Sequence, residues 1–149
     1  MLCFRINGVP PTVNHAYFNL PRGGRTLSKE GKKYKVETAA YLVRTYPAEL
    51  QQLKKNVAYG VAIKLYFEKI LNDTWPEKAE SRYKRIDASN RIKLLEDAFI
   101  TAAGTDDSQH LLVAVTKAQV EWGGENTILC IWDIEKEGLL PNDLGEYLR

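Results

Sequence analysis

Residues 57–67 alternate large apolar side chains with smaller or polar ones, and this alternation is the strongest structural constraint in the sequence. The large set comprises Val57, Tyr59, Val61, Ile63, Leu65 and Phe67. A period of two over these residues predicts a β-strand, because successive side chains of a strand point to opposite faces. A strand of this kind fits an architecture in which other elements cover a sheet.

Periodicity and the positions of proline and glycine predict the remaining elements. Expected strands cover 2–7, 111–121 and 127–134, and expected helices cover 28–46, 48–55 and 89–103. The last two strands flank Gly123-Gly124 and are predicted to form an antiparallel hairpin. Residues 12–26 and 68–86 are predicted to be loops. The order β-α-β-α-β-β predicts an α/β fold of α+β layers, in which a small mixed β-sheet packs with helices.

The length and composition favour one globular domain, residues 1–135, followed by an acidic C-terminal tail, residues 136–149. No run approaches the ~20 apolar residues of a membrane span. Residues 1–8 are too short and too polar for a signal peptide, so we expect a cytoplasmic protein. In that compartment Cys3 and Cys130 are expected to be small buried thiols rather than a disulfide.

Two common chemistries lack support in the sequence. His15 and His110 have no partner at metal-ligand spacing, which disfavours zinc. Neither GxGxxG after the first strand nor GxxxxGK[ST] is present, which disfavours the nucleotide-binding folds that use those loops.

The formal net charge of +2 is the sum of two unlike parts of the chain. Residues 1–93 carry 18 Lys and Arg against 8 Asp and Glu, whereas residues 94–149 carry 3 against 11. A basic first part is compatible with nucleic-acid binding if its charge gathers on one face. The alternative is that both parts are ordinary solvated surface.

One face of the helix expected at 89–103 is polar. Asn90, Lys93 and Asp97 lie opposite its apolar positions, with Asp87 before the helix and Asp106-Asp107 after it. Converging carboxylates could bind Mg²⁺, with Mn²⁺ as the alternative, and a lysine there could neutralise charge on a phosphate. The alternative is structural: a helix cap, an i,i+4 ion pair and a turn.

Basic side chains gather in two segments that precede this helix. Those expected to bind DNA are Arg22, Arg25 and Lys32 in the first segment and Arg82, Lys84 and Arg85 in the second. Clusters of this kind neutralise phosphates without regard to base sequence. The second segment would place phosphates beside the acidic helix entrance. The alternative is that these are ordinary surface residues.

The sequence resembles the RusA family of Holliday-junction resolvases over roughly residues 9–135. The motifs that carry the resemblance are Pro10-Pro11, Asn14, Gly24-Arg25, Leu27-Ser28, Gly31, Tyr34, the run from Arg85 to Asn90, Lys93, Asp97-Ala98 and the run from Asp106 to Gln109. The resemblance implies a homodimeric, Mg²⁺-dependent endonuclease that cleaves four-way DNA junctions in recombination and repair. It also implies a small α/β layered fold.

The resemblance assigns roles residue by residue. Asp87 and Asp107 match metal-binding aspartates, and Lys93 matches the lysine that acts on the scissile phosphate. Asn90 and Asp97 match supporting positions, and Asp97 or Asp106 could share in metal binding. Ser89 stands where the resemblance implies a second carboxylate; its hydroxyl or a water could occupy that position, or the ligand role could shift to Asp97 or Asp106.

Two other functions stay open on the sequence. The loss of a carboxylate at Ser89 suggests a protein that binds junctions but cuts them weakly or not at all. A small interaction protein that uses its sheet edge, with no nucleic-acid role, is the third hypothesis.

Overall fold

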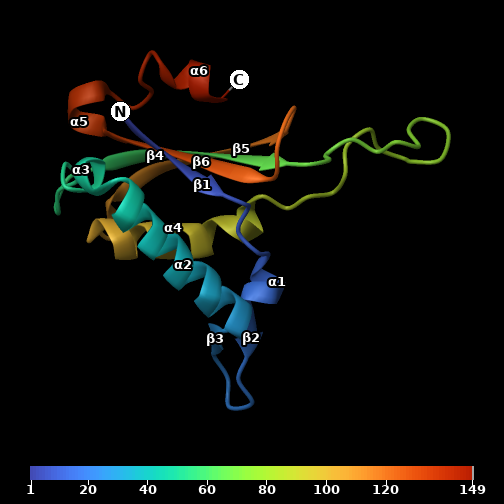
Figure 1. Ribbon diagram of the computed structural model, residues 1–149, viewed down its shortest axis with the longest axis horizontal. Coiled ribbons are helices and arrows are strands. Elements are labelled where there is room, and N and C mark those ends of the chain that lie inside the picture. The colour runs from blue at the N-terminus through green and yellow to red at the C-terminus, as the bar shows by residue number, and fades with distance from the viewer. Residues whose placement is uncertain (149) are drawn as a thin grey trace.

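A four-stranded mixed sheet lies at the centre of the computed structural model, which describes residues 1–148 (Figure 1). In spatial order its strands are β1 (Leu2–Asn7), β6 (Asn126–Asp133), β4 (Tyr59–Phe67) and β5 (His110–Gln119). Eight of the nine β4 residues are buried, which explains its place inside the sheet. The predicted mixed sheet packed with helices is confirmed, as is the order of the principal elements.

The expected hairpin between the last two strands is wrong. β5 pairs with β4 in parallel and β6 pairs with β4 antiparallel, so β4 lies between them. The physical reason is burial. β4 is buried on both of its faces, which suits an interior strand with a hydrogen-bonded strand along each edge. Many β5 residues are partly exposed, which suits a strand at the edge of the sheet. The crossover from β4 to β5 contains the helix α4 (Ser89–Ala103).

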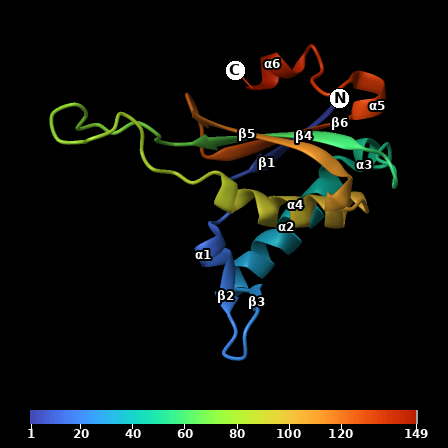
Figure 2. The same ribbon diagram turned by 180° about the vertical axis from the view of Figure 1, so that it is seen from behind.

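Two long helices cover one face of the sheet. These are α2 (Lys29–Thr45) and α4, which pack on each other and on the sheet (Figure 2). Leu42 of α2 and Leu95 and Phe99 of α4 join Phe4 and Ile63 of the sheet in the main core. The short helix α3 (Pro47–Leu50) follows α2, and its first residue is the proline expected to end the preceding helix.

Residues 12–26 form more structure than the expected loop. The short helix α1 (Val13–Ala16) leads into a hairpin of β2 (Tyr17–Asn19) and β3 (Arg25–Leu27). The glycines that suggested a loop form the turn, where Gly23 and Gly24 have φ of 86° and 90°. This hairpin projects away from the sheet beside the N-terminal end of α2 (Figure 1).

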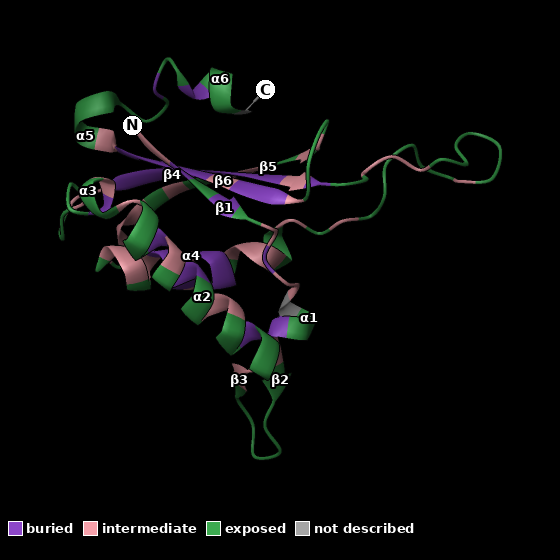
Figure 3. Cartoon of the chain, in the orientation of Figure 1, coloured by how far each residue is buried: buried purple, intermediate pink, exposed green. Residues whose placement is uncertain are grey.

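The C-terminal residues cover part of the other face of the sheet. They form α5 (Ile134–Glu137) and α6 (Leu144–Leu148), which lie on the side of the sheet away from α2 and α4 (Figure 3). Leu144 packs with Ala62, Cys130 and Trp132. The sequence predicted only an acidic tail from residue 136; the domain boundary itself stays a prediction. Arg149 lies outside the described residues. No helix within residues 1–148 is long and apolar enough to cross a membrane.

Cys3 and Cys130 form a disulfide, so the expectation of two separate thiols is wrong. The register of β1 against β6 places them directly opposite each other, with Cα atoms 4.1 Å apart. They are separated by 127 residues in the sequence, and only the pairing of the two strands brings them together.

Candidate active site

The helix α4 carries the candidate site because one side of it is buried and the other is polar. Leu95 and Phe99 are fully buried, whereas Asn90 and Lys93 are exposed on the opposite side. The helix ends at Gly104, which adopts the left-handed conformation with φ of 67°. The chain then turns into the 3₁₀ helix η1 (Asp107–Gln109), which brings the later aspartates back beside α4.

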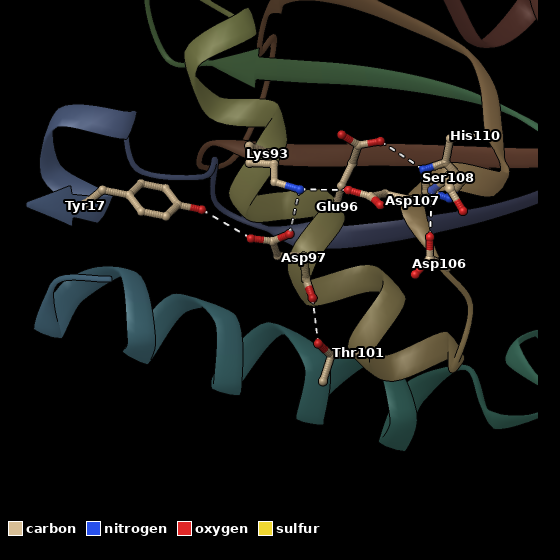
Figure 4. Close-up of polar contacts among 9 residues, drawn as sticks. All are labelled: Tyr17, Lys93, Glu96, Asp97, Thr101, Asp106, Asp107, Ser108 and His110. Atoms are coloured by element: carbon tan, nitrogen blue, oxygen red, sulfur yellow. Dashed lines mark hydrogen bonds and ion pairs between the residues drawn. The ribbon is translucent and has the colours of Figure 1, made fainter. Parts of the chain in front are cut away.

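Lys93 lies between two carboxylates (Figure 4). Its Nζ is 3.2 Å from Oδ1 of Asp97 on the same helix and 2.8 Å from Oδ2 of Asp107 on η1. The i,i+4 pair expected as the structural alternative is therefore present, but it is extended by a third residue from another element. This contact between elements makes the group a site rather than a feature of one helix surface.

The contact between Lys93 and Asp107 favours the charged forms of both residues. Hydrogen bonding to Asp107, with a further contribution from Asp97, raises the pKa of Lys93. The same hydrogen bond from Lys93 lowers the pKa of Asp107. An ammonium held beside carboxylates is suited to neutralising a phosphate that gains negative charge during attack.

Asp106 fixes the turn that presents Asp107. Its Oδ1 accepts a hydrogen bond from the backbone N–H of Ser108 at 2.9 Å, and Gln109 Oε1 accepts one from the Asp106 N–H at 3.0 Å. Together these form a capping box. Hydrogen bonding at Ser108 lowers the pKa of Asp106. Asp106 thus stabilises the turn that carries Asp107, and its carboxylate already has a hydrogen-bond partner.

Asp87, Ser89 and Asn90 form a second group at the N-terminal end of α4. Ser89 Oγ donates to Asp87 Oδ1 at 2.6 Å, and the Asn90 N–H donates to the same oxygen at 3.2 Å. The Asn90 amide also donates to Asp87 Oδ2. The hydrogen bond from Ser89 is the main reason that the pKa of Asp87 is lowered. This geometry is compatible with both predicted roles of Asp87, as a helix cap and as a metal ligand. Its carboxylate accepts a hydrogen bond from a backbone N–H at the start of α4, and the residue remains exposed.

The donor set fits Mg²⁺ only as a partly hydrated ion. Within residues 1–148, no group of three His, Cys, Asp or Glu side chains lies close enough together to hold a metal. Asp97 and Asp107 both contact the ammonium of Lys93. Asp87 is hydrogen-bonded to Ser89 instead, more than one helical turn before Lys93. Mg²⁺ often uses one or two carboxylates and keeps several waters, so a site of this composition is chemically sound.

Sequence reasoning missed Tyr17. This residue begins β2, inside the segment predicted to be a loop, and its hydroxyl donates to Asp97 Oδ2 at 3.2 Å. Burial is the main cause that raises the pKa of Tyr17, and Asp97 adds to it. No spacing rule relates Tyr17 to a helix 80 residues later, so only the packing of α1 on α4 reveals the contact.

A second missed pair joins α4 to β5. His110 Nδ1 lies 2.9 Å from Glu96 Oε1, and the histidine side chain is almost completely buried. His110 follows η1 directly and Glu96 precedes Asp97. The pair therefore links the end of η1 to α4 beside the Lys93 cluster and helps to hold η1 against the helix.

The predicted DNA-binding residues lie on two projections and on the start of α2. Arg22 and Arg25 belong to the β2–β3 hairpin, and Lys32 lies in the first turns of α2. Arg82, Lys84 and Arg85 lie on a long arm, residues 68–88, which extends from the end of β4 and returns to the start of α4 (Figures 1 and 2). All six side chains are exposed.

The arm is partly ordered by its own contacts. Its two sides pair near the base, where the N–H of Lys84 donates to the Ile70 carbonyl at 2.8 Å. The guanidinium of Arg82 lies near the rings of Trp75 and Tyr83, 5.8 and 5.7 Å from their centroids. Lys117 Nζ donates to the Ile86 carbonyl at 2.8 Å and holds the returning strand of the arm to β5.

The fold and the site define a small α+β protein with a carboxylate–lysine cluster on one helix and basic projections nearby, an arrangement suited to phosphate chemistry. The family model described as Endodeoxyribonuclease RusA matches residues 7–129. The chain therefore belongs to the RusA endodeoxyribonuclease family, which confirms the resemblance found in the sequence. A search of curated proteins finds no match to this chain.

Proposed function

We propose that this protein is a Mg²⁺-dependent endodeoxyribonuclease that cleaves four-way DNA junctions in recombination and repair. The observation that carries the proposal is the ammonium of Lys93 held between Asp97 and Asp107 on a chain of the RusA family. When bound, Mg²⁺ would supply an activated water and would stabilise charge on the phosphodiester, and Mn²⁺ is the expected substitute.

Each group of residues has a distinct role in this proposal. Asp87 and Asp107 hold the metal, and their lowered pKa values favour the ionised form that a metal requires. Lys93 neutralises the phosphate in the transition state. Ser89 and Asn90 donate hydrogen bonds that orient Asp87, and Asp106 orients the turn that carries Asp107.

The basic projections support a branched substrate. Arg22 and Arg25 lie on the β2–β3 hairpin and Lys32 lies near the start of α2, whereas the arm with Arg82, Lys84 and Arg85 extends in another direction (Figure 1). Two separated clusters suit two DNA segments that diverge from one point. A homodimer would present two equivalent sites related by a two-fold axis, which suits a junction with two equivalent strands to cut.

Cleavage of a synthetic four-way junction tests this proposal. We expect nicking with Mg²⁺ or Mn²⁺ and none with a chelator. Asp87→Asn should lower the rate by about 100-fold or more, because a neutral amide is a poor metal ligand and leaves the charge of the ion less balanced. Glu37→Gln on the exposed side of α2 is the control and should cleave at the wild-type rate.

Unchanged cleavage by Asp87→Asn would remove this residue from the metal site. Absence of cleavage by the wild type, together with binding to the junction, would instead favour the second candidate function.

The second candidate is a junction-binding protein that cuts weakly or not at all. Ser89 is the specific observation that favours it, because a hydroxyl cannot supply the negative charge of the family carboxylate. In this candidate Ser89→Asp adds a ligand beside Asp87, and Mg²⁺-dependent nicking should appear or rise by at least about tenfold. Ser89→Asn, similar in size but neutral, is the matched control. An active wild type that Ser89→Asp does not improve would contradict this candidate.

A further inference from the structure

We propose that Tyr17 is a positioning residue that acts through Asp97 to hold Lys93 in place for the reaction. The catalytic part of this inference rests on the proposed function. The positioning part rests on contacts among β2, α4 and η1 and has its own measurement.

Asp97 is held from two sides. Its Oδ1 faces Lys93 Nζ at 3.2 Å, and its Oδ2 accepts the hydrogen bond from Tyr17 at 3.2 Å (Figure 4). The Asp97 side chain is only 20% exposed, whereas that of Lys93 is 55% exposed. With one partner on each oxygen, the carboxylate has a fixed orientation. Asp97 is therefore an anchor for Lys93 rather than a metal ligand.

Tyr17 is rigidly attached to the fold. The preceding residue, Ala16, is fully buried, and its carbonyl accepts a hydrogen bond from the Ser28 N–H at 2.8 Å. A Cβ at Gly31 would overlap the Ala16 carbonyl oxygen, so α2 approaches this point as closely as a backbone can. The backbone just before Tyr17 is therefore held against the N-terminal end of α2, and the Tyr17 side chain reaches Asp97 on α4.

Lys93 needs this anchor because its other partner is a proposed metal ligand. Asp107 contacts Lys93 at 2.8 Å, and a cation bound by Asp107 would compete for the same carboxylate. A lysine freed from Asp107 would gain the large rotational freedom of its four-carbon chain. The contact with Asp97 keeps the ammonium beside the site in that state, and Tyr17 keeps Asp97 turned toward it.

The first test separates positioning from binding. Tyr17→Phe retains the ring and removes only the donor. It should lower kcat for a four-way junction about fivefold and leave KM unchanged, the loss expected for one hydrogen bond. Phe18→Leu on the same hairpin is the control, because Phe18 is half-exposed, and its kcat should equal that of the wild type. Circular dichroism and thermal melting should show that both variants fold.

A double-mutant cycle shows whether Tyr17 acts through Asp97. Tyr17→Phe should have little further effect once Asp97→Asn is present, because the hydrogen-bonded partner has already been altered. An equal fivefold loss in both backgrounds would overturn the inference, as would a Tyr17→Phe variant with wild-type kcat.

The second test does not depend on cleavage. Amine acetylation of Lys93 is followed by peptide mass spectrometry with Mg²⁺ alone present, and the exposed Lys33 serves as internal reference. We expect Lys93 to react about fivefold faster in Tyr17→Phe than in the wild type, because an Asp97 carboxylate that lacks the Tyr17 hydrogen bond holds the Lys93 side chain less firmly beside the cluster and leaves its amine more accessible to the reagent. Equal reactivity would overturn the positioning role. A wild type that never cuts would refute the proposed function while this result still decides the role of Tyr17.

Discussion

The hydroxyl of Ser89 has a defined chemical consequence at the scale of a single residue. It donates to Asp87 Oδ1 at 2.6 Å. A carboxylate at that position could bind a metal but could not donate, and its charge would oppose the ionisation of Asp87. Compared with a carboxylate, the Ser89 hydroxyl supplies no negative charge but donates the hydrogen bond that lowers the pKa of Asp87.

The two site aspartates should titrate below the usual range for separate reasons. Hydrogen bonding from Ser89 lowers the pKa of Asp87, and hydrogen bonding from Lys93 lowers that of Asp107. We expect Ser89→Ala to raise the pKa of Asp87 and not that of Asp107, and we expect Lys93→Gln to raise the pKa of Asp107 and not that of Asp87. Carbon-detected NMR titration of the side-chain carboxyls without metal measures both, and each variant is the control for the other.

The sign of the linked stability follows from these shifts. A carboxyl whose pKa is lower in the folded state stabilises the fold above its ordinary pKa of about 3.8, and that contribution is lost as the pH falls through the folded value. Each variant should therefore unfold with a weaker dependence on acid below about pH 4. A change in the pKa values of both Asp87 and Asp107 in one variant would show that the two carboxyls are coupled.

At the scale of the elements, the site is assembled from a crossover and a hairpin. The chain from β4 to β5 supplies the arm, α4 and η1, and these carry every aspartate and the lysine of the site. The β2–β3 hairpin supplies Tyr17 from the other side. The contact of α1 with the first turn of α2 sets where the hairpin leaves the fold, and Gly31 makes that contact close.

Gly31→Ala should displace α1 and the base of the hairpin. The added methyl would overlap the Ala16 carbonyl, a backbone group that cannot turn aside. We expect a loss of about 1 to 3 kcal/mol in the free energy of unfolding, the usual effect of overpacking, and a fall in activity through Tyr17. Urea denaturation measures the first quantity. Gly124→Ala, where the Cβ meets open space, is the control, and equal stability of the two variants would contradict this packing.

At the scale of the whole molecule, the sheet is covered on both faces by different parts of the chain. The long helices pack on one face, and α5 and α6 cover part of the other. Trp132 connects the C-terminal segment to the sheet, because its Nε1 donates to the Gly138 carbonyl at 3.1 Å and its ring packs closely against Gly60 of β4. The acidic residues after position 133 thus lie on segments that also contribute apolar side chains to the core.

Leu144→Ala should show that the C-terminal residues stabilise the fold. Leu144 is 4% exposed and packs with Ala62 and Trp132, so its truncation should lower the free energy of unfolding by about 2 to 3 kcal/mol. Leu140→Ala is the matched control, because Leu140 is 65% exposed and its truncation should have an effect within about 0.5 kcal/mol. Equal unfolding midpoints in urea would mean that this segment does not contribute to the core.

The sequence by itself determined the principal strands and helices and several residues of interest. The alternation along 57–67 and the amphipathic face of 89–103 predicted β4 and α4, because such periodicity is a local property of consecutive residues. The motif spacing selected Asp87, Lys93, Asp97 and Asp107. In the structure, Lys93 contacts Asp97 and Asp107. Their roles in metal binding and cleavage stay predictions.

Only the tertiary structure decided which distant segments meet. Strand order depends on burial of both faces of β4, and this placed β5 and β6 apart, where glycines in the sequence suggested a hairpin. The disulfide of Cys3 and Cys130 depends on the β1–β6 register, and the contact of Tyr17 with Asp97 depends on how closely Gly31 lets α1 pack. The disulfide joins residues 127 positions apart and the Tyr17–Asp97 contact joins residues 80 positions apart, so both interactions arise from packing rather than from sequence spacing.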